Sequence, residues 1–187
     1  FPDVESCVEE ILAISIQDYT TKQIITWGSK PFENNRKDVT YYHCPTEHQL
    51  LTSFIQYWMQ DVPDVITGWN IQLYDIPYIA RRLNRVLGEK LMKRLSPWGL
   101  VSEGETYIKG RRHITFDVGG VTQLDYLDLY KKFTYKAQES YRLDYIASVE
   151  LGQKKLDHSE FDTFQDFYTN GWQKFVEYNI IDVELVD

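Results

Sequence analysis

Hydrophobic and polar residues alternate along the first third of the chain in a pattern that predicts strands followed by a helix. Short apolar runs at 11–17, 24–28 and 39–42, separated by polar segments, indicate three strands, the first two joined as a hairpin. Thr46 is a good N-cap for a helix that extends to about Met59. The apolar residues with helical spacing, which predict its buried face, are Leu50, Leu51, Phe54, Ile55 and Trp58.

The next segment predicts a short strand that leads directly into a second helix. Residues 65–69 are mostly β-branched or aromatic, which is typical of a buried strand, and apolar residues with helical spacing follow to about Leu87. Pro77 falls in the first helical turn, where its missing N–H costs little. Asn70 and Asp75 lie between strand and helix, where α/β folds bind ligands. A turn-forming Asn and an N-capping Asp would give the same pattern.

The middle of the chain predicts a hairpin outside the core. Residues 99–120 hold five glycines and two short β-type runs, which indicates a protruding hairpin. Its tip is basic, with Lys109, Arg111 and Arg112. Such a cluster suits contact with phosphate and is also typical of a solvated loop without a role. Residues 121–127 indicate another core strand, and residues 141–151 a helix that Gly152 closes.

The C-terminal segment predicts an amphipathic helix that carries polar residues beside its apolar face. We expect residues 154–163 to form a polar loop, after which four aromatic residues cover an edge of the core: Phe161, Phe164, Phe167 and Tyr168. The apolar positions 172, 175, 176, 180 and 183 share one helix face. Tyr178 and Asp182 are four residues apart and therefore point the same way. A carboxylate beside a buried stripe needs a partner such as a metal ion.

Two motifs in this order carry a resemblance to a known family. Asn70 followed by Tyr74-Asp75, and the spacing Tyr178-x-x-x-Asp182, resemble the second and third motifs of the DEDD-type 3′–5′ exonucleases, in the branch with a tyrosine. The flanks are similar to the proofreading domain of family-B DNA polymerases, in particular those of T-even-type phages. These flanks include Thr67-Gly68-Trp69-Asn70, Asp75-Ile76-Pro77-Tyr78-Ile79, Leu124 to Phe133 and Tyr178 to Glu184.

The resemblance implies a fold, a reaction and a set of roles. The fold would be α/β, with a ribonuclease-H-like mixed sheet flanked by helices and an inserted β-hairpin at about 99–120; that insertion helps to separate a primer end from its template. The reaction would be hydrolysis of the terminal phosphodiester of single-stranded DNA with two Mg²⁺ or Mn²⁺ ions. Asp75 and Asp182 would be metal ligands, Tyr178 would orient the attacking water, and Asn70 would contact the substrate strand.

One expected motif is missing from its usual context. The family carries a first motif, Asp-x-Glu, on a central strand, whereas the Asp-x-Glu of this chain, Asp3-Val4-Glu5, follows Pro2 and has no apolar strand around it. The pair Phe1-Pro2 is similar to a pair that lies just after the first motif in T-even-type polymerases. We therefore expect residues 1–187 to be a domain fragment whose first motif lies upstream, so that the fragment alone has little activity.

Composition and charge indicate how the domain binds DNA, and they leave alternative functions open. The net charge of −8 argues that the domain alone binds DNA weakly, so we expect polymerase and N-terminal domains of the same chain to contact the rest of the DNA. Two cysteines, Cys7 and Cys44, form no disulfide framework, and the four histidines show no zinc-ligand spacing. Without a membrane span or signal peptide, the expected location is the cytoplasm of a phage-infected bacterium. The alternatives are a non-catalytic scaffold of the same fold and a free-standing nuclease.

Overall fold

The chain divides into two compact units in the computed structural model, which describes residues 2–152, 161 and 163–187. One unit comprises Phe1–Ile11 and Thr46–Phe133, and the other Leu12–Pro45 and Thr134–Asp187. The architecture is α/β with parallel and antiparallel strand pairs, as the sequence predicts. The polar loop expected at 154–163 lies, apart from residues 161 and 163, outside the described residues. No helix in the described part of the chain is long and apolar enough to span a membrane.

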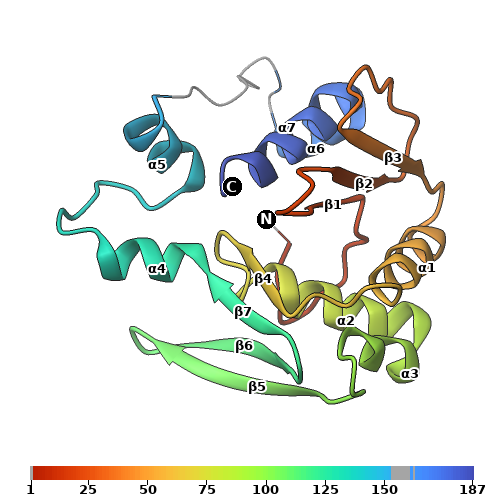
Figure 1. Ribbon diagram of the computed structural model, residues 1–187, viewed down its shortest axis with the longest axis horizontal. Coiled ribbons are helices and arrows are strands. Elements are labelled where there is room, and N and C mark those ends of the chain that lie inside the picture. The colour runs from red at the N-terminus through yellow and green to blue at the C-terminus, as the bar shows by residue number, and fades with distance from the viewer. Residues whose placement is uncertain (1, 153–160, 162) are drawn as a thin grey trace. The chain divides into compact units, whose positions relative to one another are not determined.

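A three-stranded sheet covered by a helix forms the centre of the second unit (Figure 1). The strands β1 (Ala13–Gln17), β2 (Ile24–Gly28) and β3 (Val39–His43) lie in that order, with β1 antiparallel and β3 parallel to β2. Helix α7 (Trp172–Glu184) packs on this sheet. The shared core consists of Ile24, Val39, Trp172, Val176 and Ile180. The predicted hairpin is therefore confirmed. The predicted buried face of the last helix is confirmed at positions 172, 176 and 180, whereas Phe175 and Val183 are partly buried.

Two shorter helices complete this unit. Helix α5 (Leu143–Glu150) ends where predicted, and Gly152 has a φ of 64°, in the left-handed region that follows many helices. Helix α6 (Phe164–Asn170) begins at the N-cap Thr163 and packs against α7. Its Phe167 is only 1% exposed and contacts several other aromatic rings. The predicted aromatic cover is therefore confirmed for Phe167, whereas Phe164 is 43% exposed.

The first unit contains the two longer helices of the N-terminal half. Helix α1 (Glu47–Trp58) has Thr46 as its N-cap, and all five residues of its predicted apolar face are buried. Helix α2 (Asp75–Leu87) leads into the short helix α3 (Glu89–Met92) and a 3-10 turn at Lys93–Leu95. The indole N–H of Trp58 donates to the carbonyl of Leu95 at 2.9 Å, which joins α1 to this turn.

The strands β4 (Val65–Gly68) and β7 (Thr122–Asp125) form a parallel pair that is less buried than the sequence predicts. Val65 is 50% exposed and Leu124 is 42% exposed, so the expectation of two core strands was wrong. An apolar run does not reveal how many strands flank it. Within the described residues β4 and β7 pair only with each other. Helix α4 (Tyr126–Phe133) follows β7 directly.

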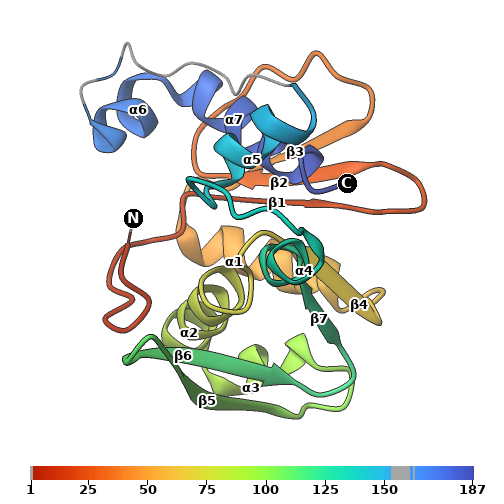
Figure 2. The same ribbon diagram turned by 90° about the vertical axis from the view of Figure 1, so that its left-hand side faces the viewer.

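The predicted hairpin is present but has one buried face. Strands β5 (Val101–Ile108) and β6 (Arg111–Val118) pair antiparallel around a two-residue turn whose Lys109 and Gly110 have φ values of 50° and 76°. Every second residue near the end of β6 is buried: Ile114, Phe116 and Val118. Strand β6 contacts α2 (Figure 2). The hairpin is therefore attached to the first unit, and the expectation that it lies outside the core was wrong for this face.

Candidate active site

A tight turn between β4 and α2 places the first two candidate residues. Asn70 has a φ of 63°, and its carbonyl accepts the backbone N–H groups of Leu73 at 3.3 Å and Tyr74 at 3.1 Å. Asn70 is therefore a turn former. Asp75 is the first residue of α2, and the N-cap position belongs to Tyr74, so the capping interpretation of Asp75 was wrong. The carboxylate of Asp75 is exposed at a helix N-terminus, where the helix dipole stabilises negative charge.

A carboxylate that sequence reasoning missed holds this turn in place. Asp125, at the end of β7, is 5% exposed and accepts three backbone N–H groups. They belong to Asn70 at 3.0 Å, Gln72 at 3.1 Å and Leu127 at 3.0 Å. One side chain thus fixes both the turn before α2 and the first turn of α4. The available signal was an acidic residue within the strand predicted at 121–127.

The turn also depends on a residue without a side chain. A Cβ atom on Gly68 would lie 2.3 Å from Cγ2 of Ile71, closer than any real contact. Gly68 lies beside Asp125 in the β4–β7 pair. The glycine before Trp69-Asn70 therefore allows the chain to fold back tightly enough to reach the Asp125 carboxylate.

Aromatic rings border Asn70. The ring of Trp69 lies 6.4 Å from that of Tyr126 and 5.9 Å from that of Tyr130, both on α4. Tyr126 is 43% exposed. Partly exposed aromatic faces beside a polar residue suit stacking with nucleobases, which every base allows irrespective of sequence.

Tyr74 serves packing rather than proton transfer. Its ring stacks on that of Tyr78 with centroids 5.9 Å apart. Burial raises the pKa of Tyr74 well above its ordinary value, and the neighbouring Asp75 carboxylate raises it further. Tyr78 is in turn tied to the N-terminal segment, because its hydroxyl donates to the carbonyl of Glu9 at 2.7 Å. The first turn of α2 is thus tied to the N-terminal segment.

The second pair of candidate residues lies on α7 in the other unit. The ring of Tyr178 meets that of Phe167 edge to face, with centroids 5.8 Å apart, so α6 supports it. Asp182 is partly buried, and its Oδ1 is shielded from solvent. Between them, the side-chain oxygen of Asn179 accepts the hydroxyl of Ser15 at 2.6 Å, which locks α7 to β1. Sequence reasoning missed this contact between residues 164 positions apart.

Asp3-Val4-Glu5 does not lie on a strand, as the sequence predicts, and Val4 and Glu5 lie in a turn. Asp3 accepts the backbone N–H of Ser6 at 2.7 Å, and this hydrogen bond lowers the pKa of the Asp3 carboxyl. Glu5 forms an ion pair with Arg112 of the hairpin at 2.7 Å. Both carboxylates therefore have local structural partners.

The donor chemistry of the candidate residues suits hard cations. Asp75 and Asp182 offer carboxylate oxygens, which Mg²⁺ and Mn²⁺ prefer. Asp75 belongs to one unit and Asp182 to the other. It stays a prediction that the two carboxylates share a site. Among the residues described, no group of three or more His, Cys, Asp or Glu side chains is arranged to hold a metal ion. Two ions bridged by carboxylates need more ligands than this pair provides.

Comparison with known proteins identifies relatives over most of the chain. The family model of the exonuclease domain of DNA polymerase family B matches residues 1–146. The DNA-directed DNA polymerase of Escherichia phage RB69 is 38% identical over 147 residues, and that of Enterobacteria phage T4 is 39% identical over 149 residues. The DNA polymerase catalytic subunit of Human herpesvirus 6B is 27% identical over 168 residues. These matches cover 78%, 79% and 83% of the chain, and 16% of each relative.

Proposed function

The chain belongs to the family of exonuclease domains of family-B DNA polymerases, and on this premise we propose that it removes nucleotides from the 3′ end of single-stranded DNA. The family match carries the proposal, because it spans both the Asn70 turn and the start of α2. The order of Asn70, Asp75, Tyr178 and Asp182 along the chain supports it. In this proposal the domain has a ribonuclease-H-like fold, a mixed sheet flanked by helices, with the hairpin β5–β6 as an insertion.

The proposed roles follow from the chemistry of each side chain. Asp75 and Asp182 hold divalent cations through their carboxylate oxygens. Two Mg²⁺ or Mn²⁺ ions, when bound, stabilise the attacking and leaving oxygens during hydrolysis of the terminal phosphodiester. The hydroxyl of Tyr178 orients the attacking water; an ordinary tyrosine pKa of about 10 makes it a poor base at neutral pH. Further carboxylates come, in this proposal, from an Asp-x-Glu motif outside residues 1–187.

The substrate strand is held by the first unit in this proposal. Asn70 contacts the strand next to the reacting phosphate, and the rings of Trp69 and Tyr126 offer surfaces for its bases. The carboxylate of Asp125 keeps Asn70 in place through the backbone and touches no substrate. Since exposed aromatic faces bind any base, this arrangement suits a terminus of arbitrary sequence.

The larger context is part of the same proposal. The chain spans 16% of the length of its phage relatives, which are DNA-directed DNA polymerases. We propose that polymerase and N-terminal domains accompany this domain in one protein, which works in the cytoplasm of a phage-infected bacterium. The hairpin would help to part a primer end from its template.

The test separates the metal ligands from the water-orienting group in the intact protein that carries this chain. Asp75→Ala and Asp182→Ala should abolish excision from a mismatched primer and weaken Mn²⁺ binding, because each removes a ligand. Tyr178→Phe keeps the ring and should slow single-turnover excision on the order of 10²-fold with Mn²⁺ binding unchanged. None of the three should affect nucleotide addition.

The control and the alternatives use the same assay. Tyr19 is 79% exposed, so Tyr19→Phe is a matched hydroxyl removal without an expected effect. If Tyr178→Phe behaves like Tyr19→Phe, the motif match at Tyr178 is accidental. An intact protein that excises nothing with either ion would favour the non-catalytic scaffold. An excising protein without nucleotide addition would favour the free-standing nuclease.

A further inference from the structure

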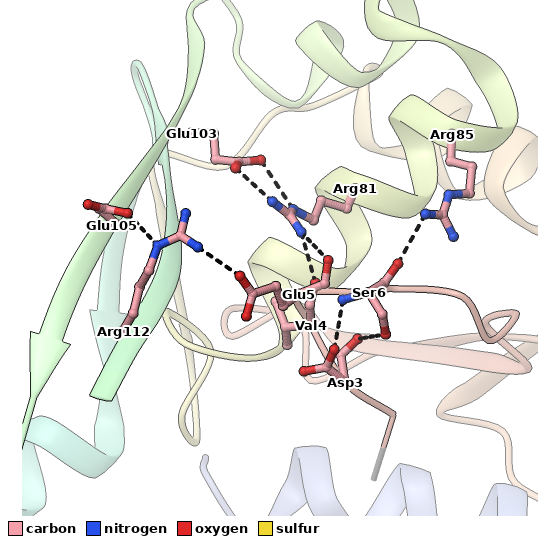
Figure 3. A network of polar contacts seen from close by, with 9 residues as sticks. All are labelled: Asp3, Val4, Glu5, Ser6, Arg81, Arg85, Glu103, Glu105 and Arg112. Carbon is pink, nitrogen blue, oxygen red and sulfur yellow. Dashed lines mark hydrogen bonds and ion pairs between the residues drawn. The ribbon is translucent and has the colours of Figure 1, made fainter. Parts of the chain in front are cut away.

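One arginine on α2 joins three parts of the first unit that are distant in sequence. The guanidinium of Arg81 binds Glu103 of strand β5 through two nitrogens, Nε to Oε2 at 3.1 Å and Nη2 to Oε1 at 2.7 Å. Its Nη1 donates to the carbonyls of Val4 at 3.2 Å and Glu5 at 2.6 Å in the N-terminal turn. Figure 3 shows Arg81 between the hairpin and this turn. Nearly the full donor capacity of the side chain is used.

A second set of contacts closes the connection between turn and hairpin. The carboxylate of Glu5 accepts a hydrogen bond from Arg112 of strand β6 at 2.7 Å. Arg112 also binds Glu105 of strand β5 (Figure 3). The N-terminal turn therefore contacts α2 through its carbonyls and the hairpin through a side chain. The three elements form a closed ring of polar contacts.

Apolar packing leaves the tip of the hairpin unsupported. The buried residues of β6 are Ile114, Phe116 and Val118, and no residue of the hairpin between Ile114 and the Lys109-Gly110 turn is buried. Beyond the Glu105–Ile114 pair, Thr106 and His113 are partly buried and the residues nearer the turn are exposed. Arg81 binds Glu103, which pairs with Phe116 on the buried side of that point, whereas Arg112 binds Glu5 from the tip. Arg81 therefore holds the tip toward α2 through the N-terminal turn, whose carbonyls it binds.

The same helix carries the proposed metal ligand. Asp75 is the first residue of α2 and Arg81 follows six residues later, so the two lie about 9 Å apart along the helix axis. A helix of this length is a rigid spacer. The contacts of Arg81 therefore add to the buried face of β6 in fixing the position of the hairpin relative to Asp75.

We propose that Arg81 is a positioning residue that fixes the hairpin relative to Asp75 and thereby governs how well a 3′ end that is still base-paired is excised. This inference rests on the proposed function. A paired end has to be opened before its terminal phosphodiester can reach a site for single strands, and only a hairpin held in place can keep the two strands apart. A 3′ end that is already single-stranded has no such requirement.

The chain offers variants that separate the contacts. Glu103→Gln removes the charge on the hairpin side and keeps the shape of the side chain, whereas Arg81→Ala removes the contacts to both hairpin and turn. Arg85, one turn further along α2, is the matched control. It donates to the carbonyls of Ser6, at 3.0 Å, and Cys7, so its hydrogen bonds go to the same N-terminal segment that Arg81 contacts.

The experiment measures excision and hairpin mobility in the intact protein that carries this chain. Excision is followed under single-turnover conditions on a single-stranded oligonucleotide and on the same 3′ sequence paired to a template. Hydrogen exchange of residues 101–118 is followed without DNA at low and high salt. Since the Arg81–Glu103 side chains are 23% and 44% exposed, added salt should weaken the pair.

The expected result is a selective defect. Arg81→Ala and Glu103→Gln should slow excision of the paired end by about fivefold, as the loss of a partly exposed ion pair implies, and change single-strand excision less than twofold. Both should speed hairpin exchange, and high salt should do the same in the unmodified protein. Arg85→Ala should leave the ratio of the two excision rates and the hairpin exchange unchanged.

Three results would overturn the inference. In Arg81→Ala and Glu103→Gln, the ratio of the two excision rates could stay the same; if both rates fell equally, the residues would have a general structural role. Arg85→Ala could reproduce the selective defect, which would assign it to the N-terminal segment. An unmodified protein that excised neither substrate would remove the proposed function itself, even if hairpin exchange responded as expected.

Discussion

Replacing Asp125 tests whether one buried carboxylate organises the candidate site. Its two oxygens accept backbone N–H groups from Asn70 and Leu127 at Oδ1 and from Gln72 at Oδ2, all within 3.1 Å. Asp125→Ala removes all three acceptors. Asp125→Asn keeps one oxygen but turns a donor toward one of the N–H groups, so that contact becomes repulsive.

The magnitude follows from the number of bonds and from burial. A hydrogen bond to a charged acceptor contributes about 1.5–3 kcal/mol, and water can reach part of this turn once the side chain is gone. We therefore expect Asp125→Ala to lower the free energy of unfolding by about 3 kcal/mol and Asp125→Asn by about 1–2 kcal/mol. For a cooperative unit of about the size of this domain, the unfolding transition of the domain should lie about 6–12 °C lower in the alanine variant. Displacement of Asn70 by about 1 Å should slow excision on the order of 10²-fold.

The assay pairs thermal unfolding with single-turnover excision in the intact protein. Asp117→Asn is the control, because Asp117 is an exposed residue of the hairpin. The control should match the unmodified protein in both measurements. If Asp125→Ala lowered the melting temperature while excision stayed unchanged, the link between this carboxylate and the Asn70 turn would be refuted. An unchanged melting temperature would refute the energetic argument itself.

Two further predictions concern the support of α2. Glu47, which is 7% exposed, pairs with the buried Arg82. Glu47→Ala leaves that charge buried and unpaired, so it should lower the free energy of unfolding, measured in urea, by about 3–5 kcal/mol. Glu89→Ala breaks only the exposed pair with Lys93 and should leave this free energy unchanged; equal effects of the two variants would contradict the burial argument. Burial raises the pKa of Tyr78 to about 12 in the folded protein, so the unfolded chain loses this proton at a lower pH, and stability should fall as the pH rises from about 10 to 12. In an absorbance titration, Tyr78→Phe should show a smaller component near pH 12 than the unmodified protein. Identical titration curves for the two proteins would contradict a buried Tyr78 hydroxyl.

The elements with strong local signals were predicted well from the sequence. Helix α1 begins at the expected N-cap and buries the expected face, because capping and helical spacing depend on residues within a few positions. The same holds for the β1–β2 hairpin and for α7. The identity of the candidate residues Asn70, Asp75, Tyr178 and Asp182 also came from local spacing.

Burial was predicted less well for strands, because it depends on whether another element covers each face of the strand. The apolar residues of β4 predicted a core strand, yet Val65 is half exposed. The hairpin was expected to protrude, yet alternate residues of β6 are buried beside α2. In both segments the sequence gives the period of the side chains but not the layer that covers them.

What the sequence by itself determined is the type and order of the elements and the residue types available for chemistry. Only the tertiary structure decided what holds them: Asp125 reaches Asn70 across 55 positions, Asn179 reaches Ser15 across 164, and Arg81 reaches Glu5 across 76 and Glu103 across 22. These contacts depend on strand register and on how helices pack, both of which are set by the burial of many residues together. The spacing of neighbouring residues does not reveal that packing, so the roles of Asp125 and Arg81 became visible only in the folded chain.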